Sequence, residues 1–330
     1  MANHPTGSAL GISFIGVAHM ERSLEFYRDV IGLTVTEASP WSGESLAAQW
    51  QCSSRLEAEA VLATYPGSRV GRVMLLRFHS DSRQEVRAGR ETTWIGLGNL
   101  NFYNNHIHET AVRLSASGYR FWSEPTTYEM NKAVGSPTEV VFEAPDSVPV
   151  NLVQLVRGTK TQTGEMASFL DSHGMTPTGF TQVVTSAHYV RDMNSAVEFH
   201  RRVLGMEPLI DAILDRPEQN NFLNLPADAR THVVFVKGHM FGKVALCAPL
   251  NYECVDLTGR AEAPNIGYLA MGFEVPDIDE AIDRTRSLGA EITAEPRDID
   301  LPHLGRLRGA VVRAPGSGAR YHLYEAGPAA

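Results

Sequence analysis

The residues best suited to acid–base chemistry stand near the end of the chain, in segment 320–325 with the sequence RYHLYE. The imidazole of His322 titrates near neutral pH, so it can take up or give away a proton. Tyr324 follows two positions later in the same predicted strand. His322 and Tyr324 are therefore candidates for catalytic residues, which depends on the family resemblance given below, while a hydrogen-bonded core histidine explains His322 equally well.

A second segment, 104–109 with the sequence NNHIHE, has the composition of a metal-ligand cluster. It precedes a predicted helix, however, where Asn and His commonly cap backbone amides. We therefore favour a solvated helix cap over a metal site. The three cysteines, Cys52, Cys247 and Cys254, form no CxxC pair, which favours buried thiols in a reducing compartment over a catalytic cysteine.

An internal repeat positions these residues. Segment 20–33, MERSLEFYRDVIGL, returns as segment 193–206, MNSAVEFHRRVLGM. Apolar residues at helical spacing predict a short helix with one buried stripe in each copy, and the glycine near its end predicts a left-handed terminal residue. The matched positions are Phe26 and Phe199, and Gly32 and Gly205. A repeat at a fixed offset outweighs local predictions when a fold is assigned.

Further landmarks extend the repeat to four modules, each a strand, a helix and a run of strands. Glu124-Pro125 returns as Glu295-Pro296, and Ala144-Pro145 returns as Ala314-Pro315. In module one, 46–50 is among the predicted extended segments. We predict a first domain of two modules at residues 1–158, a linker at 159–179 with a short helix at 165–170, and a second two-module domain at 180–330.

Charge and composition exclude several classes of function. The 330 residues contain 29 Lys plus Arg against 38 Asp plus Glu, a formal charge of −9, and no long basic run. Nucleic acid and anionic membranes are therefore not expected as partners. The beginning of the sequence lacks signal-peptide features, and no apolar run has the length of a membrane span. We expect a cytoplasmic protein, and a homodimer is compatible with the sequence.

The repeated pattern resembles the vicinal oxygen chelate superfamily, which includes glyoxalase I, extradiol dioxygenases, fosfomycin-resistance enzymes and bleomycin-binding proteins. The residues that carry the resemblance are Ser23, Phe26, Tyr27 and Gly32, then Ser195, Phe199 and Gly205, with the Ala-Pro turns at 144–145 and 314–315. The resemblance covers nearly the whole chain. It implies an α+β fold of four βαβββ modules, paired into two domains with curved mixed sheets.

In this superfamily the sheets form a cup that usually holds a divalent metal on His or Glu ligands. Alignment on the helices puts the family's ligand positions at Ile12, Leu75, Asn99 and Asn151, then at Thr185, Leu246, Ala270 and His322. One good ligand among eight does not hold a catalytic ion, so we predict no metal and no other cofactor. Glu325 with His188 or His232 could complete an unorthodox site around His322, but strand parity points His188 to the face opposite Thr185.

The resemblance also places the predicted substrate contacts. Asn99 and Asn151, together with Asn101, would orient a carbonyl or hydroxyl group from the cup floor, although asparagines bonded to one another in an inactive domain are slightly favoured. Thr185 occupies the equivalent position in the second domain. The remaining contacts, near the cup mouths, are Arg77, His79 and His239.

We expect an enzyme that acts on a small oxygenated organic molecule, with aromatic compounds among the candidates, in the second-domain cup. His322 would replace the metal in a lyase, isomerase or cyclisation reaction. Two alternatives remain open: a metal-free protein that sequesters a small molecule, and a glyoxalase-like or dioxygenase-like metalloenzyme with relocated ligands.

Overall fold

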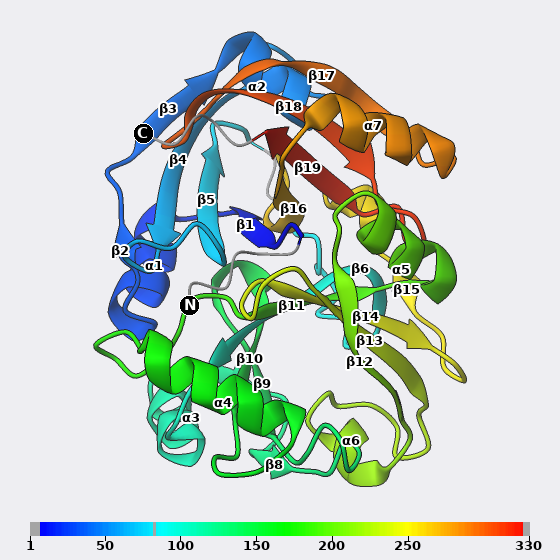
Figure 1. The fold of residues 1–330 in the computed structure, drawn as a ribbon. Coiled ribbons are helices and arrows are strands. Elements are labelled where there is room, and N and C mark those ends of the chain that lie inside the picture. Colours follow the sequence, from blue (N-terminus) through cyan, green and yellow to red (C-terminus); the bar gives the residue numbers. More distant parts are fainter. Residues whose placement is uncertain (1–6, 82–83, 326–330) are drawn as a thin grey trace.

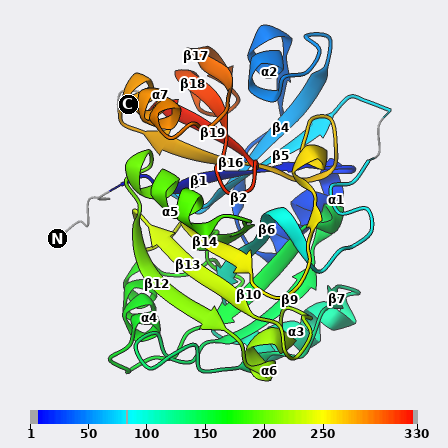
Figure 2. The same cartoon turned by 90° about the vertical axis from the view of Figure 1, so that its right-hand side faces the viewer.

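The computed structural model describes residues 7–81 and 84–325 and contains two large curved sheets, one above the other (Figure 1). Both sheets mix parallel and antiparallel pairs. The predicted α+β class, with βαβββ modules and curved mixed sheets, is confirmed. Short helices accompany the strands on the outside (Figure 2).

The first sheet has nine strands from the two ends of the chain. They are β1 (Leu10–Gly16), β2 (Thr34–Val35), β3 (Ser39–Ser42), β4 (Glu57–Thr64), β5 (Arg72–Phe78), β16 (Gly267–Val275), β17 (Ile292–Leu301), β18 (Gly305–Arg313) and β19 (Arg320–Glu325). Their order is β17-β18-β19-β16-β1-β5-β4-β2, and β3 pairs with β4.

The second sheet has ten strands from the middle of the chain. They are β6 (Trp94–Tyr103), β7 (Arg120–Phe121), β8 (Thr126–Thr127), β9 (Thr138–Glu143), β10 (Pro149–Gln154), β11 (Thr185–Tyr189), β12 (Glu207–Leu214), β13 (Thr231–Lys237), β14 (Lys243–Pro249) and β15 (Val255–Asp256). Their order is β12-β13-β14-β11-β6-β10-β9-β7, with β15 on β6 and β8 on β9.

The module pairing differs from the prediction. Modules one and four share the first sheet because β1 pairs antiparallel with β16, and modules two and three share the second because β6 pairs with β11. The predicted limits near residues 158 and 180 therefore separate modules and not sheets. A repeat shows that modules are equivalent, but the choice of partner is made by tertiary packing.

The four module helices follow the predicted pattern. Residues 20–30 form α1 (Met20–Leu24) and a π-helical turn (Glu25–Val30), and the equivalents are α3 (Ile107–Ala116), α5 (Met193–Arg202) and α7 (Ile278–Ser287). Gly32 and Gly205 have φ of 84° and 62°, the left-handed region that glycine enters without a steric penalty. The linker carries α4 (Gln162–His173), which is longer than the predicted helix 165–170.

The remaining helices are α2 (Gly43–Trp50), α6 (Pro217–Asn221) and two 3₁₀ turns (Pro145–Ser147 and Thr258–Arg260). Segment 46–50, predicted as extended, lies within α2, so that prediction was wrong. A five-residue apolar run does not distinguish a buried strand from one turn of a buried helix. In α2, Leu46 and Trp50 are four residues apart and both are buried.

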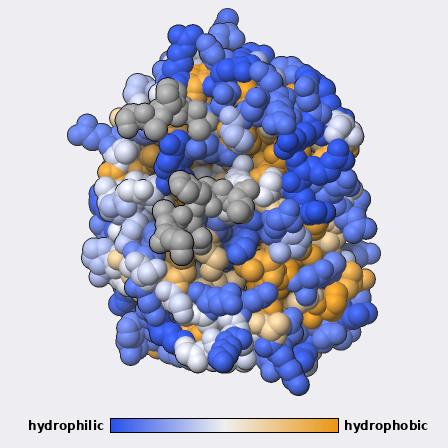
Figure 3. Space-filling model, viewed as in Figure 1, coloured by the Kyte–Doolittle hydropathy of each residue, from blue (hydrophilic) through white to orange (hydrophobic). Residues whose placement is uncertain are grey.

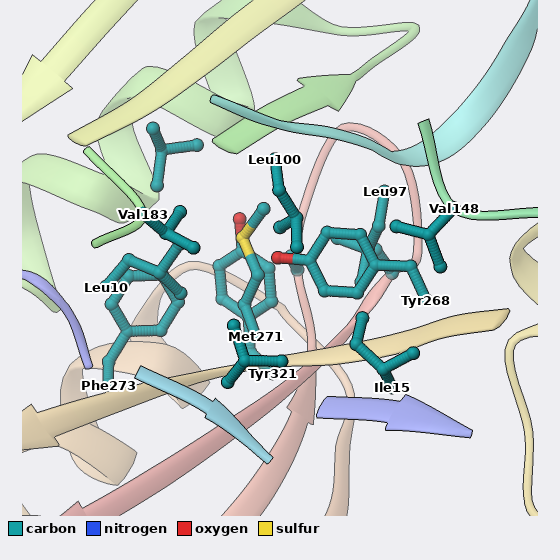
Figure 4. Close-up of a cluster of buried hydrophobic side chains, with 14 of the residues drawn as sticks. Leu10, Ile15, Leu97, Leu100, Val148, Val183, Tyr268, Met271, Phe273 and Tyr321 are labelled. Atoms are coloured by element: carbon teal, nitrogen blue, oxygen red, sulfur yellow. The ribbon is translucent and has the colours of Figure 1, made fainter. Parts of the chain in front are cut away.

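The main hydrophobic core lies between the two sheets and beneath the module helices (Figure 4). Phe26 and Phe199 pack there, as the repeat predicted. The phenol of Tyr268 in β16 links the sheets, because its oxygen lies 3.1 Å from the hydroxyl of Ser13 in β1 and 3.0 Å from that of Ser186 in β11. A second hydrophobic cluster lines the concave interiors. We call these interiors the first cup and the second cup, after their sheets.

Candidate functional site in the second cup

Side chains fill the first cup. Helix α2 inserts Trp50 among the inward-facing side chains, and its ring centroid lies 5.8 Å from that of Phe14, 6.0 Å from that of Phe78 and 4.8 Å from that of His322. Phe14, Trp50 and His322 are all at most 2% exposed. The first cup is therefore closed around its own aromatic side chains.

His322 is held as a neutral imidazole in this cup. Its Nδ1 lies 3.0 Å from Oε1 of Gln49, and because an amide oxygen only accepts, Nδ1 carries the proton. Burial, with Arg320 and Arg313 nearby, lowers the pKa of His322 well below its usual value. Its Nε2 is buried without a hydrogen-bond partner among the described residues, so it presents an unused lone pair.

Charged residues lie on either side of His322 along β19. The guanidinium of Arg320 contacts Glu262 and the side chain of Gln51, and Arg72 donates to the hydroxyl of Tyr324 over 3.3 Å. Three further buried polar atoms of this cup have no partner within the described residues: Gln49 Nε2, Trp50 Nε1 and Arg320 Nε.

The second cup keeps some accessible surface at its inward-facing side chains. Asn99, Asn101, Ala187, Ala245 and Cys247 are 4 to 8% exposed, whereas Asn151, Thr185 and Lys243 are 1 to 2% exposed. Most core-facing residues of the same strands, such as Leu100, Phe102 and Leu246, are 0% exposed. A water-sized probe therefore reaches part of this cup.

A row of polar residues crosses the floor of this cup. Asn151 is the register partner of Asn101, Asn101 is that of Thr185, and Thr185 is that of Lys243. Neighbouring strands lie about 4.8 Å apart, so the row brings two amides, a hydroxyl and an amine to the same level. Asn99 joins the row by donating a hydrogen bond to the side-chain oxygen of Asn101.

A buried carboxyl group stands beside Asn151. Glu139 Oε1 accepts a hydrogen bond from the hydroxyl of Tyr128 over 2.7 Å, and Oε2 accepts one from Nδ2 of Asn151 over 2.5 Å. Burial raises the pKa of Glu139, against the opposing effect of these two bonds. Glu139 can thus change protonation state closer to neutral pH than an ordinary glutamate.

The structure brings some of the predicted site residues together. Thr185, Asn99 and Asn151 share the second cup, and the half-buried His239 lies in the β13–β14 hairpin close enough to Lys243 to feel its charge. His322 and Tyr324 share the first cup, so the two groups belong to different sheets. The predicted catalytic and substrate-binding roles of these residues remain predictions.

Arg77 and His79 lie away from both cup interiors. Both are exposed, and Arg77 pairs with Glu59 at 3.0 Å while His79 lies between Glu57 and Glu59. His188 faces the core opposite Thr185, as strand parity predicted, and bonds Tyr321 and Ser317.

Two of the aligned ligand positions were on the wrong face. Leu75 and Leu246 belong to the core cluster between the sheets, and the inward positions of these strands are Met74 and Ala245. Glu139 and Lys243 were missed altogether. Each lies at the end of an apolar strand, where a charged residue usually marks a solvated strand end, and only the burial of both in one cup sets them apart.

The donor set does not fit the divalent metal that the fold family implies. No group of three His, Cys, Asp or Glu residues within the described parts of the chain could hold an ion. In the second cup the carboxylate of Glu139 already accepts two bonds, and Lys243 adds an amine. In the first cup the guanidinium of Arg320 disfavours a cation near His322.

The outer surface gives little further indication of function. The face in Figure 3 is mostly hydrophilic, and its widest apolar area lies in the half formed by the second sheet. Within the residues described, no helix combines the length and apolarity that crossing a lipid bilayer requires.

Two cups built from paired βαβββ modules define a protein of the vicinal oxygen chelate fold. Residues 4–152 match the family model of the Glyoxalase/Bleomycin resistance protein/Dioxygenase superfamily. The resemblance seen in the sequence is thus confirmed, with the family model covering the first two modules of the chain. No curated protein matches the chain at a significant level.

Solved structures extend the likeness to nearly the whole chain. Glyoxalase I from Zea mays is 14% identical with a TM-score of 0.62, and the match covers 96% of this chain and 92% of that one. A putative dioxygenase from Bacillus subtilis is 12% identical with a TM-score of 0.57, covering 97% and 86%. At these identities the similarity establishes the fold alone.

Proposed function

We propose that the protein is an enzyme that binds a small oxygenated organic molecule in the second cup and converts it by acid–base chemistry without a metal, as a lyase, isomerase or cyclase. The superfamily assignment supports a small-molecule site. The choice of cup rests on the polar row across the floor of the second cup.

One observation carries the proposal. Asn151 is 2% exposed, its Nδ2 is fixed on Glu139, and its Oδ1 has no hydrogen-bond partner among the described residues. The bond to Glu139 fixes which way the amide faces, so a hydrogen-bond acceptor is left unused beside a buried carboxyl group. A ligand hydroxyl that donates to this oxygen removes the cost of leaving it unsatisfied.

Glu139 then has the position of a general acid or base. A hydroxyl bound at Asn151 Oδ1 brings the neighbouring carbon and oxygen atoms of the ligand next to the carboxyl group. With its pKa raised, Glu139 can remove a proton from the ligand and return it to another atom. Such a transfer is the common element of eliminations, isomerisations and ring closures, and the amides of Asn101 and Asn99 would orient the ligand's other oxygens.

The test begins with a screen of hydroxylated and carbonyl compounds, aromatic and aliphatic, by thermal shift and then by mass spectrometry for conversion. Asn151→Leu is expected to weaken binding about tenfold or more. Glu139→Gln is expected to keep binding and lower turnover about 10²–10⁴-fold. Glu129→Gln, at an exposed carboxylate, is the matched control and should change neither.

Three outcomes would contradict the proposal. Turnover that a chelator abolishes and an added metal restores would identify a metalloenzyme with relocated ligands. A ligand recovered unchanged after hours on the protein would identify a sequestering protein. Binding that Asn151→Leu leaves intact would remove the second cup as its site.

The first cup supplies a second candidate site because the lone pair of His322 Nε2 is unused. Catalysis there requires α2 to move, since Trp50 fills the cup. His322→Ala distinguishes the two cups: it should abolish turnover only if the first cup holds the substrate. A cytoplasmic location and a homodimer remain predictions.

A further inference from the structure

Lys243 is unusual for this protein. The chain contains four lysines and 25 arginines, and Lys243 is the one lysine that is buried, at 1% exposure. Lys132 and Lys160 are exposed and Lys237 is half-buried. Only a lysine readily becomes a neutral amine when it is buried, since an arginine keeps its charge.

Two of the three buried arginines have carboxylate partners, whereas Arg72 bonds a carbonyl and a hydroxyl and Lys243 likewise has no carboxylate partner among the described residues. Arg87 pairs with Glu143 at 2.9 Å, and Arg320 pairs with Glu262. No carboxylate among the described residues lies within 4 Å of the Lys243 amine. Its Nζ donates instead to the carbonyl oxygen of Met240, and it lies 3.4 Å from the hydroxyl of Tyr103.

An aromatic cluster that begins at Tyr103 lies on one side of the amine. The Tyr103 ring centroid lies 5.6 Å from Nζ and 6.1 Å from the ring of Phe241, and Phe169 of α4 packs on Phe241 at 5.1 Å. The titratable groups on this side are Tyr103, Lys237, His239 and His173, and the carboxyl group of Glu139 lies near enough to Tyr103 to raise the pKa of its phenol. No carboxylate among the described residues contacts the amine itself, so burial favours its uncharged form.

Lys243 is placed to reach a molecule in the second cup. It shares the inward parity of Ala245 and Cys247 on β14 and stands in register with Thr185, beside Asn101. A neutral lysine amine in an apolar surrounding is a nucleophile toward carbonyl carbon. Burial, with Lys237 nearby, lowers the pKa of Lys243 to about 7, which supports the same conclusion.

We propose that Lys243 forms a covalent imine with the carbonyl carbon of an aldehyde or ketone bound in the second cup. Because this carbonyl compound is the oxygenated molecule of the proposed function, the imine rests on that function. The substrate class that follows is a carbonyl compound that also carries a hydroxyl group, which would bind to Asn151.

The chemistry balances without a further reactant. The Nζ lone pair forms a bond to the carbonyl carbon, the C=O π pair moves to oxygen, and a proton passes from nitrogen to that oxygen. Nitrogen then forms the C=N bond as the hydroxyl group leaves with a second proton as one molecule of water. Protonation of the imine nitrogen makes an electron sink, which assists Glu139 in removing a proton from the adjacent carbon.

The experiment uses the full-length protein and reductive methylation with limiting [¹³C]formaldehyde and cyanoborohydride at pH 7. At that pH the neutral fraction of an amine with a pKa of about 7 exceeds that of an ordinary lysine by about 10³-fold. Lys243 is expected to be methylated at least about tenfold faster than Lys132, Lys160 and Lys237, as read by peptide mass spectrometry. Its ¹³C signal, assigned by its loss in Lys243→Met, should titrate near pH 7.

Larger probes then test the substrate class. Hydroxyacetone and 3-hydroxybenzaldehyde are each added with cyanoborohydride, and at least one of them is expected to leave a stable adduct at Lys243, absent in Lys243→Met and retained in Lys160→Arg. Methylation of Lys243 no faster than that of the other lysines, or a titration near pH 10, would overturn the proposal. So would the absence of an adduct from both larger carbonyls.

Failure of the imine and failure of the proposed function are distinguishable. The trapping experiment measures formation of a covalent bond at Lys243. The proposed function is tested by a different quantity, which is turnover and its loss in Glu139→Gln. Turnover that persists in Lys243→Met would leave the acid–base enzyme in place and remove the imine. The wild-type peptide map needs no variant, so the proposal stays testable even if Lys243→Met does not fold.

Discussion

Asn151 Nδ2 donates a hydrogen bond to Glu139 Oε2 over 2.5 Å, from one strand of the second sheet to its antiparallel neighbour. Together with the hydroxyl of Tyr128, it satisfies both oxygens of a carboxyl group that has almost no contact with solvent. The same bond turns the amide oxygen of Asn151 away from Glu139. A single contact therefore fixes the carboxyl group and the neighbouring acceptor.

Glu139→Gln should stabilise the fold more at neutral pH than at acidic pH. Because burial raises the pKa of Glu139 in the folded state, the folded protein binds its proton more tightly than the unfolded chain. Stability is thus lost as pH rises from the pKa of the unfolded chain, about 4.5, through the raised pKa of the folded protein, at up to about 1.4 kcal/mol per pH unit. Urea unfolding of variant and wild type at pH 4 and pH 8 measures this. A difference that does not change with pH would contradict it.

The buried histidines should make the protein sensitive to mild acid. His200 Nδ1 donates to the Ala196 carbonyl, so its Nε2 accepts from Tyr321; His188 Nδ1 then donates to Tyr321, and its Nε2 accepts from Ser317. Every side chain in this row of hydrogen bonds is neutral. Burial lowers the pKa of His188 to about 3 and that of His200 to about 4.

Below pH 6.5, His188 and His200 become protonated in the unfolded chain but stay neutral in the folded protein. The free energy of unfolding therefore falls as pH decreases toward 4. Each histidine contributes up to about 1.4 kcal/mol per pH unit. Unfolding free energies at pH 7.5, 6.5 and 5.5 should show the loss beginning near 6.5, with a smaller slope in a His188→Gln/His200→Gln double variant. An unchanged slope in that variant would assign the acid sensitivity to other groups.

Glu262→Gln should be strongly destabilising because it leaves Arg320, which is 0% exposed, without its carboxylate. Breaking a buried pair costs about 3–5 kcal/mol, and we expect about 2–3 because the Glu262 side chain keeps 29% exposure. Adding Arg320→Met should recover part of the loss. Asp298→Asn, which breaks an exposed pair with Arg306, is the control and should cost less than about 1 kcal/mol. Equal losses in both variants would refute this account.

Trp50→Ala tests whether α2 is part of the core of the first cup. The indole packs on Phe14, Phe78 and His322, and removing it should cost about 3–5 kcal/mol. Val112→Ala, at an exposed helical position, should change stability by no more than about 0.5 kcal/mol. If α2 were a mobile lid over an open cup, Trp50→Ala would be nearly neutral in chemical denaturation.

The repeat and its glycines were sufficient to predict the modules and the curved sheets, because module geometry is set by local patterns of apolar residues and turns. The partner of each module was not predictable, since β1 offers the same kind of edge to β6 as to β16. Segment 46–50 shows the same limit at a smaller scale, because Trp50 is buried whether its segment is extended or helical.

The candidate site likewise contains residues that the sequence indicated and residues that it did not. Asn99, Asn151 and Thr185 could be predicted to share a cup because they occupy positions where the family usually has ligands. Glu139 and Lys243 were missed because a charge near the end of a strand is normally solvated, and burial of such a group is a property of the assembled cup. The placement of His322 in the first cup follows from the module pairing, which the repeat leaves open.

Modules one and four, which form the first sheet, lie at the two ends of the chain, and modules two and three, which form the second sheet, lie between them. The strands of the second sheet lie within residues 94–256, so this sheet can form as soon as that stretch has left the ribosome. The first sheet joins residues 10–78 to residues 267–325. Strand β1 is made first, yet its antiparallel partner β16 is made only after the whole second sheet. While the second sheet is being made, β1 can pair with β5 on one side but still lacks β16 on the other, and an unpaired strand edge of this kind is where a wrong partner can bind.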